Sequence, residues 1–126
     1  MDERAPGPPQ RLKKRADFQR AAKGLRASAS SLTVQAAPGA GDAVRVGFTT
    51  TKKLGCAVIR NRVRRKLRAA AAAIPAIAWE AGNDYVVIAR AEALRRPFAD
   101  LLGDVAGALR RVAKERRRRA TDTKGS

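Results

Sequence analysis

The sequence predicts an α+β fold in which helices pack against a small sheet of three or four strands. Three segments show the period of amphipathic helices, and three others show strand patterns. Their chain order is α-β-β-α-β-α, which is typical of an α+β sandwich. A chain of 126 residues has room for a single domain with one modest core.

The first half of the domain is expected to hold one short helix and two strands. The helix is predicted over Ala16 to Lys23, where Asp17 can accept hydrogen bonds from free amides and Gly24 can close the end. Segments 31–37 and 43–51 alternate apolar and polar residues around a Pro-Gly-Ala-Gly-Asp turn. We therefore expect these two segments to pair as a hairpin.

The second half is expected to alternate helix, strand and helix. Ala57 to Ile74 carries a narrow apolar stripe and ends before Pro75, so it is the clearest predicted helix. Asp84–Arg90 is apolar almost throughout, as a buried strand should be, and could pair in parallel with a strand of the hairpin. Pro97 opens the last helix. Its predicted apolar stripe is Phe98, Leu101, Leu102, Val105, Leu109 and Val112.

The ends of the chain differ from its middle in composition. Residues 1–10 hold three of the six prolines and are predicted to form a disordered arm. Residues 11–115 are predicted to form one α+β domain, and residues 116–126 a flexible basic tail.

The net charge indicates a polyanionic partner. There are 28 Lys and Arg against 11 Asp and Glu, which gives 28 − 11 = +17. Alanine accounts for 27 of the hydrophobic residues, so the apolar driving force for folding is small while self-repulsion is large. The cations form three clusters, and the central one, Lys52 to Arg68, contains eight cations and no acid. Nucleic acid is favoured as the partner, with an anionic membrane surface as the competing polyanion.

Several classes of protein are disfavoured by composition. Without histidine there is no His-based acid–base catalysis or His metal ligand, and one cysteine cannot form an intramolecular disulfide. That cysteine, Cys56, is expected to be a small buried residue. No apolar run is long enough to span a membrane and the N-terminus lacks a secretory signal, so cytoplasmic localisation is the expectation.

The central helix carries the side chains with the clearest chemistry. On a helical wheel, the face away from its apolar stripe holds Arg60, Asn61, Arg64, Arg65 and Arg68, with Arg62 and Lys66 beside them. Guanidinium groups bind phosphate oxygens in pairs and stack on unpaired bases, while an amide can contact a base edge or a 2′-hydroxyl. Because the segment has no acids to offset like-charge repulsion, an ordinary solvent-exposed face is a poor explanation.

The same segment resembles a known family. The pattern Lys52-Lys53-x-Gly-x-Ala-Val-x-Arg60-Asn61-Arg62-x-Arg-Arg-x-Leu-Arg68 is similar to the RNR motif of the bacterial ribonuclease P protein subunit. Weaker similarities occur in the right order at Arg11-Leu-Lys-Lys, at Arg45-Val-Gly and at Asp84-Tyr-Val-Val-Ile-Ala-Arg. The resemblance covers roughly residues 11–112, which is most of the chain.

This resemblance implies a function in tRNA maturation. In the family an RNA is the catalyst, and the holoenzyme removes the 5′ leader of precursor tRNA by hydrolysing a phosphodiester with Mg²⁺ held mainly by the RNA. The expected partners are that catalytic RNA and precursor tRNA, with no membrane and no protein partner evident, in a bacterial cytoplasm. The implied fold is that of ribosomal protein S5 domain 2, with a left-handed crossover around the RNR helix.

The resemblance also assigns two sets of site residues, neither catalytic and neither binding metal. Contacts to the catalytic RNA are expected from Lys52, Lys53, Arg60, Asn61, Arg62, Arg64, Arg65 and Arg68. A separate cleft for the single-stranded leader is expected from Phe18 and from the polar side of the sheet, namely Thr33, Gln35, Arg45, Thr49 and Thr51.

The leader cleft is expected to be sensitive to salt. The family often has aromatic residues where this chain has Ala22 and where it has Gln35, so stacking is reduced and contacts to phosphate gain weight. Leader-dependent affinity, measured by titration of precursor tRNA, should therefore fall roughly 10³-fold between about 50 and 200 mM salt if about six phosphates are contacted. A nearly constant affinity would contradict this expectation.

Two other functions compete with this one. The acids are scattered singly, apart from Asp100 and Asp104, which we interpret as surface charges matched to a helix dipole. Because metal-dependent phosphodiester cleavage needs convergent carboxylates, a protein-only nuclease is disfavoured. A non-catalytic RNA-binding module, such as a ribosomal or architectural protein, is the alternative that composition alone leaves open.

Overall fold

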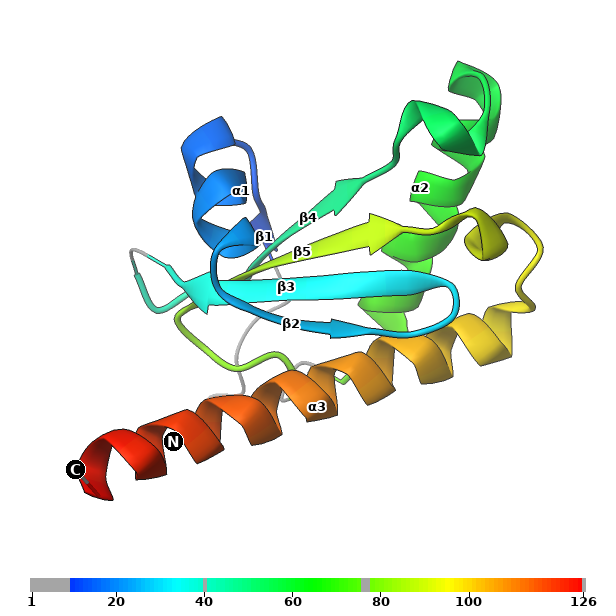
Figure 1. Ribbon diagram of the computed structural model, residues 1–126. Helices are drawn as coiled ribbons and strands as arrows, with labels where there is room; N and C mark the ends of the chain where they lie inside the picture. Colours follow the sequence, from blue (N-terminus) through cyan, green and yellow to red (C-terminus); the bar gives the residue numbers. More distant parts are fainter. Residues whose placement is uncertain (1–9, 40, 76–77, 126) are drawn as a thin grey trace, which may run out of the picture.

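The computed structural model describes residues 10–39, 41–75 and 78–125, with side chains described to residue 120. Its elements, coloured along the chain in Figure 1, are β1 (Gln10–Arg11), α1 (Arg15–Ala22), β2 (Leu25–Ser28), β3 (Leu32–Pro38), β4 (Arg45–Thr49), the short helix η1 (Lys52–Leu54), α2 (Ala57–Ala73), β5 (Asn83–Ala89), the short helix η3 (Ala91–Leu94) and α3 (Phe98–Gly125). The predicted α+β class is confirmed, with five strands rather than three or four.

The strand order is β1-β4-β5-β3-β2, which corrects the predicted hairpin. β3 and β4 are not neighbours, because β5 lies between them, antiparallel to β3 and parallel to β4. Alternation identifies a strand and its buried face but carries no information about its partner. The parallel pairing of β5 is confirmed, and α2 forms the crossover between β4 and β5. The left-handed sense of that crossover stays a prediction.

Two strands were missing from the prediction. β1 has only two residues and pairs in parallel with β4, so it is too short to show a period. It includes Gln10, so the predicted disordered arm is wrong at this residue, and residues 1–9 lie outside the described part. β2 (Leu-Arg-Ala-Ser) forms the actual hairpin with β3, although its residues have weak strand propensity.

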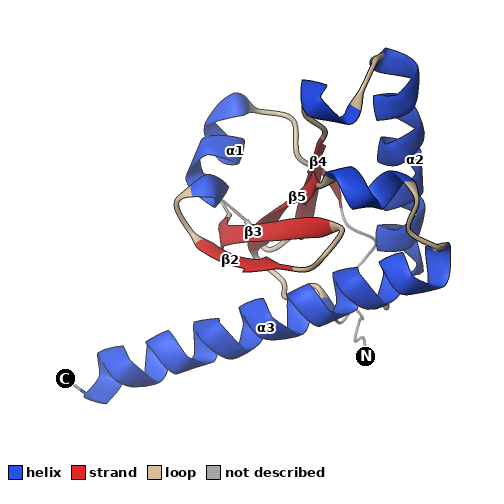
Figure 2. Cartoon of the chain, turned by 45° about the vertical axis from the view of Figure 1, so that its right-hand side comes forward, coloured by secondary structure: helices blue, strands red, loops and turns tan. Residues whose placement is uncertain are grey.

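The sheet separates two layers of helices. On one face α2 and α3 cover the main core, in which Leu32, Val63, Leu67 and Leu101 are fully buried. On the other face α1 covers a smaller cluster that includes Leu12, Ala21 and Val86, and Phe18 packs against it. Figure 2 shows α1 and α3 on opposite sides of the sheet.

α3 is longer than expected and more firmly attached to the domain. The segment predicted as a flexible tail instead continues the helix to Gly125, since arginine and alanine are strong helix formers and Glu115 forms ion pairs with Arg118 and Arg119 one turn later. Asp104 is not a surface charge either. It is largely buried and accepts two hydrogen bonds from Arg96, at 2.9 and 3.0 Å.

No helix in the described part of the chain is both long enough and apolar enough to cross a membrane.

Candidate RNA-binding surface

α2 presents a row of cations opposite its buried stripe. Val63, Leu67, Ala70 and Ala71 are its buried residues, and they face the sheet and α3. On the rest of its surface lie six side chains that we call the α2 ridge: Arg60, Asn61, Arg62, Arg64, Arg65 and Arg68. Of these, Arg60 and Arg64 are half-buried and the other four are exposed. The helix therefore holds them in a fixed array on a rigid element.

The α2 ridge carries no charge compensation within the described residues. Arg64 is held by the Asn61 amide oxygen at 3.0 Å and by the Thr50 hydroxyl at 2.9 Å, and neither group is charged. No carboxylate pairs with an α2 arginine anywhere in the described part of the chain. Several guanidinium groups on one helix face thus repel one another until an anion approaches.

Lys66 belongs to the structure rather than to the ridge. Its ammonium donates to the carbonyl oxygens of Ala93 and Arg96, so it joins α2 to the end of η3. The sequence pattern alone could not distinguish this half-buried, bridging role from a solvent-facing one, because Lys66 flanks the exposed face of the wheel.

The approach to α2 combines two exposed lysines with an exposed thiol. Lys52 and Lys53 lie in η1, directly before the turn at Gly55, which adopts a φ of 132°. Cys56 is the N-cap residue of α2 and is exposed, so the expectation of a buried residue was wrong. The backbone amides of Ile59 and Val58, which are free at the helix start, lower the pKa of the Cys56 thiol.

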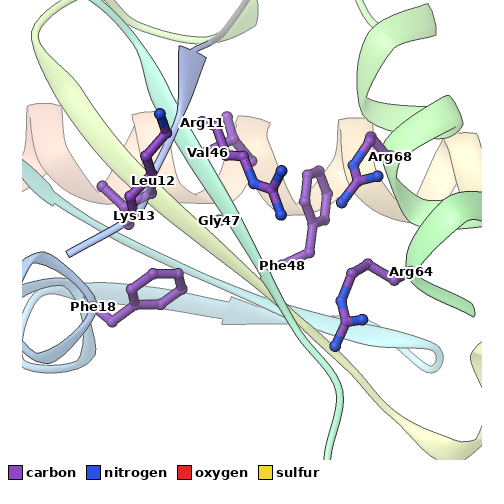
Figure 3. A pocket seen from close by; sticks show the side chains of 9 residues that line it. All are labelled: Arg11, Leu12, Lys13, Phe18, Val46, Gly47, Phe48, Arg64 and Arg68. Atoms are coloured by element: carbon purple, nitrogen blue, oxygen red, sulfur yellow. The ribbon is translucent and has the colours of Figure 1, made fainter. Parts of the chain in front are cut away.

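A groove of about 390 Å³ lies along β4, between α1 and α2 (Figure 3). We call it the β4 groove, and it is lined by Arg11, Leu12, Lys13, Phe18, Val46, Gly47, Phe48, Arg64 and Arg68. Phe18 lies on one side, Arg64 and Arg68 lie on the other, and β4 runs between them. Four cations and two aromatic rings around one groove suit a single nucleic-acid strand, through phosphate contacts and stacking.

Gly47 determines where Phe18 lies. A Cβ atom at this position would come within 2.5 Å of Phe18 Cζ, so only glycine allows the ring to rest on the β4 backbone. The ring packs beside Leu12 and Val86 on its inner side and is half-buried. Phe18 thus serves both the small core and the wall of the β4 groove.

Of the predicted leader residues, only Phe18 lines this groove, and none of the five on the polar side of the sheet does. Thr33 and Gln35 lie on β3 beneath α1 and are buried, with Thr33 hydrogen-bonded to Ser28 at 3.0 Å. Thr49 is half-buried at the end of β4, and Thr51 is exposed at the start of η1. α1 packs across β3, which a strand pattern cannot reveal.

Arg45 has carboxylate partners. Its guanidinium donates to both oxygens of Asp84, at 2.8 and 2.7 Å, and approaches Asp17 at 3.2 Å. The hydrogen bonds from Arg45 to Asp84 outweigh partial desolvation and raise the pKa of Arg45. Arg20 completes the network by pairing with Asp17 at 2.7 Å. Asp17 therefore fastens α1 to the sheet instead of capping its own helix.

The prediction missed several residues that line the β4 groove. Arg11 and Lys13 belong to the first of the three basic clusters, Arg11 to Arg26, and to the Arg11-Leu-Lys-Lys segment that resembles the family, and these two features could have identified them. Phe48 alternates with Val44 and Val46 along the strand, which is the pattern of a residue that faces the core. It is only half-buried, since β1 ends before it and leaves this part of β4 at the sheet edge.

The fold and this surface define a class of protein, namely small α+β domains suited to binding a polyanion. Their crossover helix carries a row of arginines that, in the described part of this chain, have no carboxylate partners. A model of the family described as Ribonuclease P matches residues 8–113. The ribonuclease P protein component of Paramagnetospirillum magneticum is 52% identical over 108 residues, which cover 81% of each chain.

Solved structures agree with these sequence matches. The ribonuclease P protein from Thermotoga maritima has a TM-score of 0.71 at 26% identity, over 82% of this chain and 97% of its own. The protein from Staphylococcus aureus has a TM-score of 0.63 at 30% identity, over 79% and 92% of the two chains. The chain belongs to the ribonuclease P protein family, and its role as a subunit of ribonuclease P is supported over that of a ribosomal or architectural protein.

Proposed function

We propose that this chain binds the catalytic RNA of ribonuclease P through the α2 ridge and the 5′ leader of precursor tRNA through the β4 groove, in a bacterial cytoplasm. The observation that carries the proposal is the α2 ridge itself, which has no carboxylate partner within the described residues. Lys52 and Lys53 extend the same positive surface at the start of the helix. Phosphates would replace the missing counter-charges and release their own counterions.

The chemistry of leader removal is assigned to the RNA, with Mg²⁺ held mainly there. Within the described residues, the most buried acidic side chains are already paired with arginines: Asp17 and Asp84 with Arg45 and Arg20, and Asp104 with Arg96. Two-metal phosphodiester hydrolysis needs carboxylates that converge on the ions. The protein instead reduces repulsion between two RNAs and holds the leader in place.

Reconstitution tests this proposal. The protein is mixed with the host's candidate catalytic RNA and a precursor tRNA at low Mg²⁺, and the product is analysed for a mature 5′-phosphate end. We expect cleavage at the mature junction to require both components. Cleavage by the RNA that is equally fast without the protein at low Mg²⁺ would contradict the proposed role.

Phe18 should affect precursor tRNA and spare mature tRNA. Replacing it with alanine (Phe18→Ala) removes the aromatic wall of the β4 groove, and loss of one stacked base costs about 1–3 kcal/mol. Binding of both tRNAs to the reconstituted holoenzyme is measured, with Phe18→Tyr as the control that keeps the ring. Equal losses for precursor and mature tRNA would show that Phe18 acts through the fold rather than the leader.

Anions should stabilise the free protein. With a net charge of +17, an uncompensated α2 ridge and a small apolar core, the folded state is opposed by its own charges. Because sulfate binds the folded array better than the dispersed unfolded chain, thermal unfolding followed by circular dichroism should shift to higher temperature with sulfate. Chloride at matched ionic strength is the control, and an identical response to both salts would rule out specific anion binding.

A further inference from the structure

The C-terminal part of α3 lies outside the domain that the family match covers. The match ends at residue 113, whereas α3 continues to Gly125. In Figures 1 and 2 this part of the helix extends past β2 and beyond the edge of the sheet. It is distant from the β4 groove, which lies at the opposite edge of the sheet beside β4. Neither of the proposed sites uses it.

Two arginines fix how this helix is turned relative to the domain. Arg111 donates to the backbone carbonyl of Ser28 at 2.6 Å, at the end of β2. Arg116 is half-buried and forms an ion pair with Glu80, in the loop before β5. These contacts bind one side of the helix to the domain, so the opposite side must face outward.

The outward side carries three free cations. Arg110, Lys114 and Arg117 are exposed, and none has a hydrogen bond or ion pair in the described part of the chain. Their spacing of four and three residues places them in one line about 10 Å long, which we call the α3 stripe. Repulsion along this line disfavours the free helix, so a polyanion bound there would stabilise it.

The two turns of α3 before the α3 stripe carry glycines, and therefore no side chains, on the same face. Gly103 and Gly107 continue the line of the α3 stripe toward the helix start, and a Cβ atom at Gly103 would meet nothing within 4 Å. At Gly107 the nearest atoms are guanidinium nitrogens of Arg111 and Arg110, at 3.6 and 3.7 Å. Packing therefore does not require either glycine, although each costs a helix about 1 kcal/mol relative to alanine. A bare helix surface beside cations lets a bulky backbone approach closely.

We infer that the α3 stripe and the bare turns before it dock against the sugar–phosphate backbone of a double-helical segment of the catalytic RNA, which rests on the function proposed above. Three cations in line with no aromatic beside them suit phosphates rather than bases. α3 packs on the same face of the sheet as α2, whereas α1 and Phe18 lie on the other. The catalytic RNA that α2 binds is therefore the partner within reach, whereas the leader would lie in the β4 groove, toward the opposite edge of the sheet.

A membrane surface does not suit this helix. Leu101, Val105, Leu109 and Val112 of α3 are buried in the main core, and the exposed Phe98 lies at the start of the helix, about three turns before Arg110. After Val112 the helix has only alanines as apolar residues, so it has no face to insert among lipids. An acidic protein is the remaining alternative, and it is separated from RNA by the experiment.

The test compares three triple variants of the full chain, each losing three positive charges. The α3 variant is Arg110→Gln, Lys114→Gln and Arg117→Gln, which keeps helix propensity. The matched control, Arg15→Gln, Lys23→Gln and Arg26→Gln, removes exposed cations on and near α1. The third variant neutralises Arg60, Arg65 and Arg68 in the α2 ridge. Affinity for the catalytic RNA is measured against salt, with hydroxyl-radical footprinting of each complex.

For the α3 variant, the negative slope of log affinity against log salt should become shallower by about 2. Affinity near 0.15 M salt should fall about 30- to 100-fold. Protection of one duplex should be lost while the footprint of α2 remains. The α3 assignment is wrong if the α3 variant binds the catalytic RNA as tightly as the wild type, which is the result expected if an acidic protein is the partner. It is also wrong if the control variant loses as much affinity as the α3 variant. Loss of assembly in the α2 variant alone would then leave the proposed function standing, whereas intact assembly in that variant would refute the proposed function itself.

Discussion

Neutralising the α2 ridge should all but abolish assembly with the catalytic RNA. In the triple variant Arg60→Gln, Arg65→Gln and Arg68→Gln, we expect affinity near 0.15 M salt to fall about 100-fold or more, and the salt slope to fall by 2 to 3. The reason is that these guanidinium groups have no carboxylate partner within the described residues, so we expect the RNA phosphates to be their counter-charges. Filter binding over a salt series measures both quantities.

A matched variant separates this effect from net charge. Arg15→Gln, Lys23→Gln and Arg26→Gln removes three exposed cations away from α2 and should change the salt slope by less than 1. Circular dichroism of each variant checks that the fold is kept, which glutamine favours because it is a good helix former. Unchanged assembly in the α2 variant would leave the arginine row without a function.

Removing the carboxylate of Asp84 should lower the free energy of unfolding more than removing any other acidic side chain in the described part of the chain. In Asp84→Ala the guanidinium of Arg45 loses its two shortest hydrogen bonds, and Arg45 and Asp17 are left incompletely paired beneath α1. The Asp84 side chain is 1% exposed and that of Arg45 is 25% exposed, so the cost should approach about 3 kcal/mol. In a protein with a small core this is a large share of the total stability. Urea unfolding with sulfate present measures it.

Asp42→Ala is the control for Asp84, since Asp42 is an exposed acid in the loop before β4. The double variant Asp84→Ala and Arg45→Met should be less destabilised than the two single changes added together, because it leaves no unpaired charge at that position. Additive losses would mean that the two side chains are independent, contrary to the geometry.

The elements with strong periodicity were predictable, and their partners were not. α2 and its end before Pro75 followed from the spacing of Val63, Leu67 and Ala70, which are buried as expected. β5 was recognised as a buried strand, but no local pattern shows that it lies between β3 and β4. β2 was missed because its pairing with β3, rather than its own residues, makes it a strand.

The binding surface was predictable to the extent that charge reveals it. The α2 ridge followed from a run of arginines with no acids, and the structure places it on the exposed side of the helix. The sequence could not show which polar residues are already paired. Arg45 and Asp84 are 39 positions apart, and Lys66 reaches a carbonyl 30 positions away. Such contacts depend on how the layers meet, as does the position of Phe48 in the β4 groove.

The most direct test of the account uses protein freed of all RNA. Nuclease-treated protein is incubated with precursor tRNA and Mg²⁺, first without and then with the catalytic RNA. In a third arm, the variant that lacks the positive charges of Arg60, Arg65 and Arg68 replaces the wild-type protein in the presence of that RNA. We expect a mature 5′ end only when the RNA is present, and at low Mg²⁺ only when the α2 ridge is intact. Correct cleavage by the protein alone would contradict the account.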